Sequence, residues 1–143
     1  MDETDAALLR LLSKNARTPV ATLARRLGLA RSTVQARIDR LEARGVIAGY
    51  ALRLGEGAAR EAIRATVLLT LEPRATAAVL TRLKAMPGVE AAHTASGRFD
   101  MILNLAARST AELDDTLDRI GALDGVRGSE SLIHLSTRID RRG

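Results

Sequence analysis

The sequence of 143 residues has no cysteine and no tryptophan, and it contains one tyrosine, Tyr50, and one phenylalanine, Phe99. Without cysteine the chain can form no disulfide bond, thiol nucleophile or thiolate metal site. Long apolar runs are also lacking, since none approaches the ~20 residues that cross a bilayer. The first residues, MDETDAALLR, are acidic, whereas a signal peptide begins with basic residues. We therefore expect a cytoplasmic protein without a membrane-spanning segment.

Basic residues are concentrated in the first part of the chain. Residues 1–54 contain 10 Lys and Arg against 5 Asp and Glu, whereas residues 55–143 contain 12 of each sign. A basic segment joined to a balanced one is typical of a module that binds a polyanion. No segment pairs a broad apolar face with a lysine-rich one, as membrane-surface helices do. The charge distribution therefore favours nucleic acid as the partner.

Three segments near the start of the chain have apolar residues at helical spacing. The first lies behind the acidic stretch Asp2–Asp5, which suits the N-terminus of a helix. The second begins at Thr18-Pro19, where we expect the hydroxyl to cap the helix, and it ends at Gly28. A short turn then leads to the third, Arg31–Ala43. Three short helices joined in this way predict a helix-turn-helix.

The segment after the third helix alternates between apolar and other residues. Residues 46–54 have Gly49 as a turn, which predicts a two-stranded wing. Glycines, alanines and charges then interrupt the apolar periodicity. We expect a winged helix-turn-helix domain at 1–54, a linker at 55–61 and a second domain at 62–143.

The third helix carries Val34, Ile38 and Leu41 on one line, which we expect to face the core. At ~100° per residue, polar residues occupy the opposite face. A helix docked in a major groove by its N-terminus would present that face to DNA, although a charged helix face is in other proteins simply solvated. We expect base-edge contacts from Ser32, Thr33, Gln35 and Ala36. We expect phosphate contacts from Arg31, Arg37 and Arg40. We also expect Arg17 and Thr18 to contact DNA.

The second domain alternates strand-like and helical patterns in the order βαββαβ. Strands are expected at 62–71, 89–96, 101–107 and 126–139. The helices are expected to begin at Glu72-Pro73 and at the capping box Ser109 to Glu112. An internal repeat relates LKAMPGVE at 83–90 to IGALDGVR at 120–127. The pattern predicts an α+β fold, a ferredoxin-like sandwich with both helices on one face of an antiparallel sheet.

The predicted strands carry more apolar surface than two helices can cover. The residues on which this expectation rests are Val89, Ala91, Met101, Leu103, Leu105, Leu132 and Leu135. Because a large exposed apolar face marks an interaction surface, we expect a homodimer formed through the sheets.

The stretch LARRLGLARSTVQARIDRLEARGVIAGY, residues 23–50, resembles the DNA-binding domain of the Lrp/AsnC (leucine-responsive or feast/famine) transcription regulators. The βαββαβ half resembles the effector-binding domain of the same family. The resemblance implies a regulator that binds double-stranded DNA and forms dimers, with an octamer as the larger assembly. One departure stands at Ala30, where the family usually has serine, so a helix cap worth ~1 kcal/mol is missing.

The resemblance also implies a site for an amino acid or related small molecule in the segment Ser96, Gly97, Arg98, Phe99 and Asp100, between the second and third strands. Exposed N–H groups near Gly97 could bind a carboxylate, and Asp100 could accept from an α-ammonium group. The alternative is structural: Gly97 supplies positive φ and Asp100 caps the turn.

Three other functions are alternatives to regulation. An RNA-binding sheet needs aromatic residues in its strands, and neither aromatic residue lies in one. An enzyme, resembling the siroheme decarboxylases of this architecture, would need His93 or His134 beside Asp100 or Glu130, yet neither histidine has a titratable neighbour at a fixed spacing. An effector-binding protein that no longer binds DNA is the other alternative. We expect no catalytic residues, no metal site and no cofactor.

Overall fold

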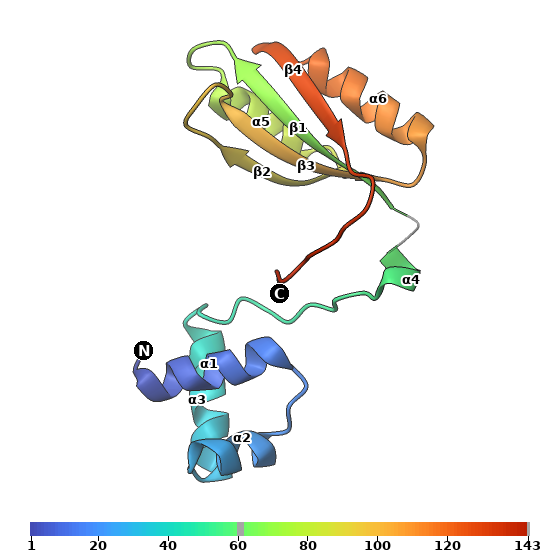
Figure 1. Cartoon of the computed structure of the whole chain (residues 1–143). Coiled ribbons are helices and arrows are strands. Elements are labelled where there is room, and N and C mark those ends of the chain that lie inside the picture. Colours follow the sequence, from blue (N-terminus) through green and yellow to red (C-terminus); the bar gives the residue numbers. More distant parts are fainter. Residues whose placement is uncertain (60–61, 143) are drawn as a thin grey trace. The chain divides into compact units, whose positions relative to one another are not determined.

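The computed structural model describes residues 1–59 and 62–142, and it divides the chain into two compact units, residues 1–53 and residues 54–141 (Figure 1). The first unit contains α1 (Glu3–Lys14), α2 (Val20–Leu27) and α3 (Arg31–Ala43). The buried side chains of the three helices form one core, composed of Leu8, Leu12, Leu23, Ala24, Val34, Ile38 and Leu41. This unit is the predicted helix-turn-helix.

The ends of α1 and α2 show how the sequence sets the helix boundaries. Asp2 accepts a hydrogen bond from the Asp5 N–H at 2.8 Å, and Asp5 accepts one from the Asp2 N–H at 3.4 Å, so a capping box begins α1. Gly28 ends α2 with a left-handed φ of 68°. The predicted cap on α2 is wrong: Pro19 is the N-cap residue, and the Thr18 hydroxyl instead donates to the carbonyl of Asn15 at 2.6 Å.

The predicted two-stranded wing is not formed. Residues 46–54 contain no strand in the described part of the chain, and Leu52 is 85% exposed. Tyr50 from this segment donates a hydrogen bond from its hydroxyl to Glu42 on α3 at 3.1 Å. An isolated two-stranded hairpin is at best marginally stable, and the helices of this unit offer it no third strand.

The second unit has the predicted βαββαβ order. Its strands are β1 (Ile63–Leu71), β2 (Val89–Thr94), β3 (Met101–Ala107) and β4 (Val126–Ile133), and its two long helices are α5 (Thr76–Lys84) and α6 (Thr110–Gly121). The strands form one antiparallel sheet in the order β2-β3-β1-β4. A short helix, α4 (Glu56–Ala59), lies in the predicted linker, of which residues 60 and 61 are outside the described residues.

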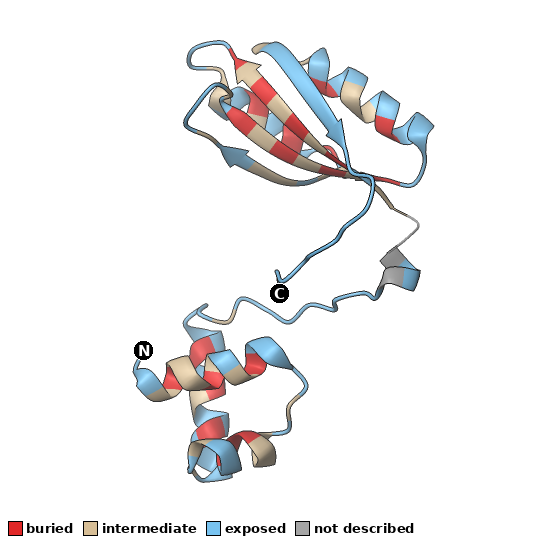
Figure 2. Cartoon of the chain, viewed as in Figure 1, coloured by how far each residue is buried: buried red, intermediate tan, exposed pale blue. Residues whose placement is uncertain are grey.

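One face of the sheet is covered by α5 and α6 (Figure 1). Alternate residues of β1 and β3 are buried against them, as the colours of Figure 2 show. The expectation about exposed apolar strand residues was wrong for five of them. Met101, Leu103 and Leu105 belong to this buried core, Val89 packs against it, and Leu135 lies beyond the end of β4. The uncovered face carries the remaining alternate residues of each strand, and it is more polar than expected.

Several element boundaries differ from the sequence prediction, and β2, for example, ends at Thr94 instead of at residue 96. The helix α5 begins at Thr76 rather than at Glu72-Pro73, because residues 72–75 form a turn in which Arg74 has a φ of 67°. The strand β4 ends at Ile133, six residues before the predicted end at Ile139. The capping box predicted at the start of α6 is formed in part. Ser109 accepts from the Glu112 N–H at 3.1 Å, but the Glu112 carboxylate accepts from the Arg108 N–H at 3.0 Å instead of from the Ser109 N–H.

Candidate DNA-binding and effector sites

The outward face of α3 is polar and exposed. Val34, Ile38 and Leu41 are buried in the core of the unit, as predicted. Six of the residues expected to contact DNA are exposed on this helix: Arg31, Ser32, Thr33, Gln35, Ala36 and Arg40. Most of the residues predicted to contact DNA therefore lie on α3, and they are accessible from Arg31 at its start to Arg40 near its end.

Two cations on α3 make no ion pair with the residues that the structure describes. Neither Arg31 nor Arg40 takes part in an ion pair among residues 1–59 and 62–142. The Gln35 side chain, by contrast, donates to Asp39 at 2.8 Å. The exposed face of α3 therefore carries two positive charges that can bind an anion. The side-chain amide of Gln35 is held in its orientation by Asp39, one helical turn away.

The N-terminus of α3 has no side-chain cap. Ala30 is the N-cap residue, with extended φ and ψ of −69° and 149°, and it makes no side-chain hydrogen bond. The first N–H groups of a helix point outward and carry partial positive charge. An uncapped helix N-terminus on an exposed face is well suited to a phosphate oxygen.

Arg37 does not share the outward orientation of the other arginines. Its Nη1 atom donates to Asp2 at 2.8 Å and to Asp5 at 3.0 Å, and its side chain is 20% exposed. The Arg37 guanidinium, and then the Asp5 N–H, hold the pKa of Asp2 below its ordinary value of 3.8. Hydrogen bonds to Asp2 and Asp5 raise the pKa of Arg37 in turn. The guanidinium thus ties α3 to the capping box of α1.

Sequence reasoning missed this ion-pair cluster. Asp2 and Asp5 were interpreted through the helix dipole of α1 alone, and their partner lies more than thirty residues away in the chain. A signal was available in the helix periodicity, because Arg37 is adjacent to the buried Ile38 and lies one turn after the buried Val34.

The ion pairs predict an acid-dependent contribution to the stability of the first unit. Because the pKa of Asp2 is lowered on folding, its contribution is full above the ordinary value of 3.8 and is lost as the pH falls through the lower folded value. The stability difference between the wild type and Arg37→Gln should therefore shrink as the pH is lowered from 7 to about 2. Urea unfolding at a series of pH values measures this difference. Arg40→Gln, on the same helix, should show a difference that does not change with pH, and an equal pH dependence in both variants would contradict the assignment.

Arg17 and Thr18 lie in the connection between α1 and α2 rather than on α3. The Arg17 N–H donates to the Asn15 side chain at 3.0 Å, and Thr18 is bound to the Asn15 carbonyl. Arg17 is exposed and Thr18 is half-buried. Their hydrogen bonds fix a tight turn before α2.

The turn between β2 and β3 carries the five residues expected to hold an effector. Gly97 has a φ of 147°, and the Arg98 guanidinium lies over the Phe99 ring, 5.1 Å from its centroid. The Asp100 carboxylate accepts a hydrogen bond from the Leu71 N–H at 2.8 Å. The Asp100 N–H donates to the Leu69 carbonyl, also at 2.8 Å. Asp100 therefore has a structural role, which is to join this turn to the end of β1.

The two histidines lie at the uncovered face of the sheet. His134 Nε2 is 2.7 Å from the Thr66 hydroxyl, and His93 is paired across the ladder with Ile102. Within the described ranges, no hydrogen bond or ion pair joins either histidine to Asp100 or Glu130. No group of three His, Cys, Asp or Glu that could hold a metal is present there, and no helix in those ranges is long and apolar enough to cross a bilayer.

A helix-turn-helix with an exposed basic helix, followed by a ferredoxin-like unit, defines a DNA-binding transcription regulator with a separate regulatory domain. Residues 1–42 match the AsnC-type helix-turn-helix domain, and residues 64–143 match the Lrp/AsnC ligand binding domain. The chain belongs to the Lrp/AsnC family of transcription regulators.

Individual relatives match over nearly their whole length. The HTH-type transcriptional regulator LysM of Saccharolobus solfataricus is 30% identical over 96% of this chain and 95% of its own. The crystal structure of the Mycobacterium tuberculosis leucine response regulatory protein (LrpA) is 33% identical, covers 100% of this chain and 98% of its own, and superposes with a TM-score of 0.82. The transcriptional regulator NMB0573 of Neisseria meningitidis, solved as an L-Met complex, is 22% identical, covers 98% and 93%, and has a TM-score of 0.86.

Proposed function

We propose that α3 reads duplex DNA in the major groove. Ser32, Thr33, Gln35 and Ala36 face the base edges, and Arg17, Thr18, Arg31 and Arg40 contact phosphates. The observation that carries the proposal is the exposed face of α3, on which short polar side chains are flanked by two arginines that make no ion pair within residues 1–59 and 62–142. Arg37 is not assigned to a phosphate, because its guanidinium is held by Asp2 and Asp5; it orients α3 instead.

We further propose that a second copy of the chain covers the open face of the sheet. Leu68 and Ile102 are neighbours at the middle of this face, and Leu132 on β4 is 50% exposed beside them. A two-fold dimer would set two recognition helices at a fixed spacing, so that one dimer recognises two half-sites. Association of dimers into an octamer is the larger assembly that we propose, and light scattering measures both.

An amino acid or a related small molecule is the effector that we propose for the β2–β3 turn. Exposed N–H groups around Ser96 and Gly97 suit its carboxylate, and the second Asp100 oxygen suits its ammonium group, with Arg98 and Phe99 beside them. The L-Met complex of NMB0573 supports the choice of an amino acid. The effector alters DNA binding by favouring one assembly over another.

Fluorescence anisotropy tests the DNA proposal, with the duplex upstream of the protein's own gene compared with a scrambled duplex at several salt concentrations. We expect a preference of ~10³-fold or more for the upstream duplex. Amino acids added to the complex should shift this affinity. Failure to bind either duplex, with the oligomer intact, would favour an effector-binding or enzymatic role without DNA binding.

Substitutions on α3 should separate phosphate contacts from base contacts. Arg40→Ala should weaken binding to all sequences and reduce the salt slope by about 0.9. Gln35→Ala should change the sequence preference by about 1–3 kcal/mol at one base pair and leave the salt slope unchanged. Arg10→Ala, an exposed position on α1, serves as the charge-matched control for Arg40. Identical behaviour of the Gln35 and Arg40 variants on all operator variants would contradict this division of contacts.

A further inference from the structure

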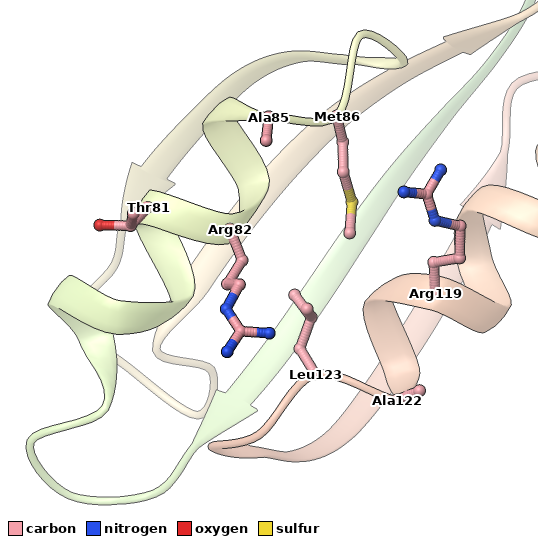
Figure 3. A pocket seen from close by; sticks show the side chains of 7 residues that line it. All are labelled: Thr81, Arg82, Ala85, Met86, Arg119, Ala122 and Leu123. Carbon is pink, nitrogen blue, oxygen red and sulfur yellow. The ribbon is translucent and has the colours of Figure 1, made fainter.

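A cavity of about 560 Å³ opens between the C-terminal ends of α5 and α6 (Figure 3). Its walls are formed by Thr81, Arg82, Ala85, Met86, Arg119, Ala122 and Leu123. None of these residues belongs to α3 or to the β2–β3 turn. The cavity is wide open to solvent, and its volume is that of a site for a small molecule.

The internal repeat places equivalent residues on the two sides of this cavity. The offset that aligns residues 83–90 with 120–127 also pairs Arg82 with Arg119, and it pairs Met86 with Leu123. Met86 is 8% exposed and packs into the core, and Leu123 is half-buried. Two equivalent cations therefore border an apolar centre that is built from two equivalent side chains.

The two guanidinium groups are both available to a ligand. In Figure 3 they lie on opposite sides of Met86 and Leu123, with Arg82 extending from α5 and Arg119 from α6. Neither guanidinium makes an ion pair or a hydrogen bond in the described part of the chain. Arginine in a last helical turn complements the helix dipole, but that role does not require both side chains to border one cavity.

We propose that this cavity binds a small organic dianion, a dicarboxylate whose two charged ends are separated by an apolar middle. Each carboxylate pairs with one guanidinium, and the methylene groups between them lie on Met86 and Leu123. A second copy of the chain is a poor occupant, because a two-fold contact through this surface would oppose arginine to arginine. The site is independent of the effector site proposed at Ser96–Asp100 and does not rest on DNA binding.

Isothermal titration of the full-length protein with a series of straight-chain dicarboxylates, from succinate to suberate, tests the proposal. We expect at least one member to bind about tenfold or more tightly than the monocarboxylate of equal length, since the latter meets a single arginine. Arg82→Gln and Arg119→Gln should each weaken binding of that member by about tenfold or more. Arg82→Lys and Arg119→Lys should retain part of the affinity, because the charge is kept and the bidentate geometry is lost.

Arg108→Gln is the matched control, because Arg108 is an exposed arginine of the same unit that does not border the cavity. It should bind the dicarboxylate as the wild type does, and circular dichroism should show the same fold for all variants. The proposal is overturned if no dicarboxylate saturates the protein by about 10 mM, a concentration that already corresponds to very weak binding. It is equally overturned if the monocarboxylate binds as well, or if Arg108→Gln weakens binding as much as Arg82→Gln.

Discussion

Gly125→Ala is expected to destabilise the second unit by about 3 kcal/mol, as the sum of a backbone and a packing cost. Gly125 has a φ of 96°, a conformation that residues with a side chain rarely adopt. A Cβ at this position would lie 2.6 Å from the Ala75 Cβ and 3.4 Å from a Val79 methyl group. The Gly125 carbonyl also accepts from the Glu72 N–H at 2.7 Å, so the backbone cannot move freely to relieve the clash. Urea unfolding of the wild type and the variant measures the difference.

The internal repeat supplies a matched control at Gly88, which the repeat aligns with Gly125. A Cβ at Gly88 would lie 3.4 Å from the Ala106 carbonyl oxygen and 3.5 Å from the Thr116 hydroxyl. Its φ lies outside the left-handed region, so Gly88→Ala should change stability by less than about 1 kcal/mol, because a lower entropy of the unfolded chain offsets the tight contact. Equal losses in the two variants would show that the clash at Ala75 is relieved and that our reason is wrong.

The hydrogen bond between the Glu72 N–H and the Gly125 carbonyl explains why the start of α5 could not be predicted from the sequence. Glu72-Pro73 has the local signals of a helix N-terminus, yet α5 begins only at Thr76. The Glu72 N–H bonds to Gly125, and the Glu72 carboxylate lies 3.4 Å from Arg127. These partners are fifty or more residues away, so tertiary contacts determine the conformation of the turn. The N-cap at Ser109, by contrast, is satisfied within four residues and was predicted correctly, although the Glu112 side chain bonds to the Arg108 N–H and so does not complete the capping box.

The predictions for the candidate DNA-binding site and the open sheet face likewise depended on whether the signal in the sequence is local. Helical periodicity was enough to predict that Val34 is buried and that Gln35 and Arg40 are exposed. Periodicity could not predict that the Arg37 guanidinium is held by Asp2, because the packing of α3 against the start of α1 has no local signal. The strands β1 and β3 were predicted, but the apolar residues of both faces were counted together, so the open face was expected to be more apolar than it is.

The open face of the sheet gives the prediction with the largest expected effect on function. Ile102→Glu should dissociate the proposed dimer, raising its dissociation constant by about 10³-fold or more, because an unpaired buried charge costs several kcal/mol and a two-fold dimer would bury two of them. Ile102 is paired with Leu68 at the middle of the sheet and lies on the face opposite to α5 and α6, so the substitution leaves the core of the unit intact. Sedimentation or light scattering should show a monomer with an unchanged circular dichroism spectrum.

Loss of the dimer should in turn weaken DNA binding, because a monomer contacts one half-site and no longer benefits from the linked second contact. The affinity for the upstream duplex should fall by about 10²-fold or more, although every residue of α3 is unchanged. Ala111→Glu places the same charge on an exposed position of α6, and it should alter neither assembly nor DNA affinity. A dimeric Ile102→Glu variant would show that the open face is not the interface. A monomeric variant with full DNA affinity would instead show that a single helix-turn-helix recognises the site unaided, and that the second unit does not set half-site spacing.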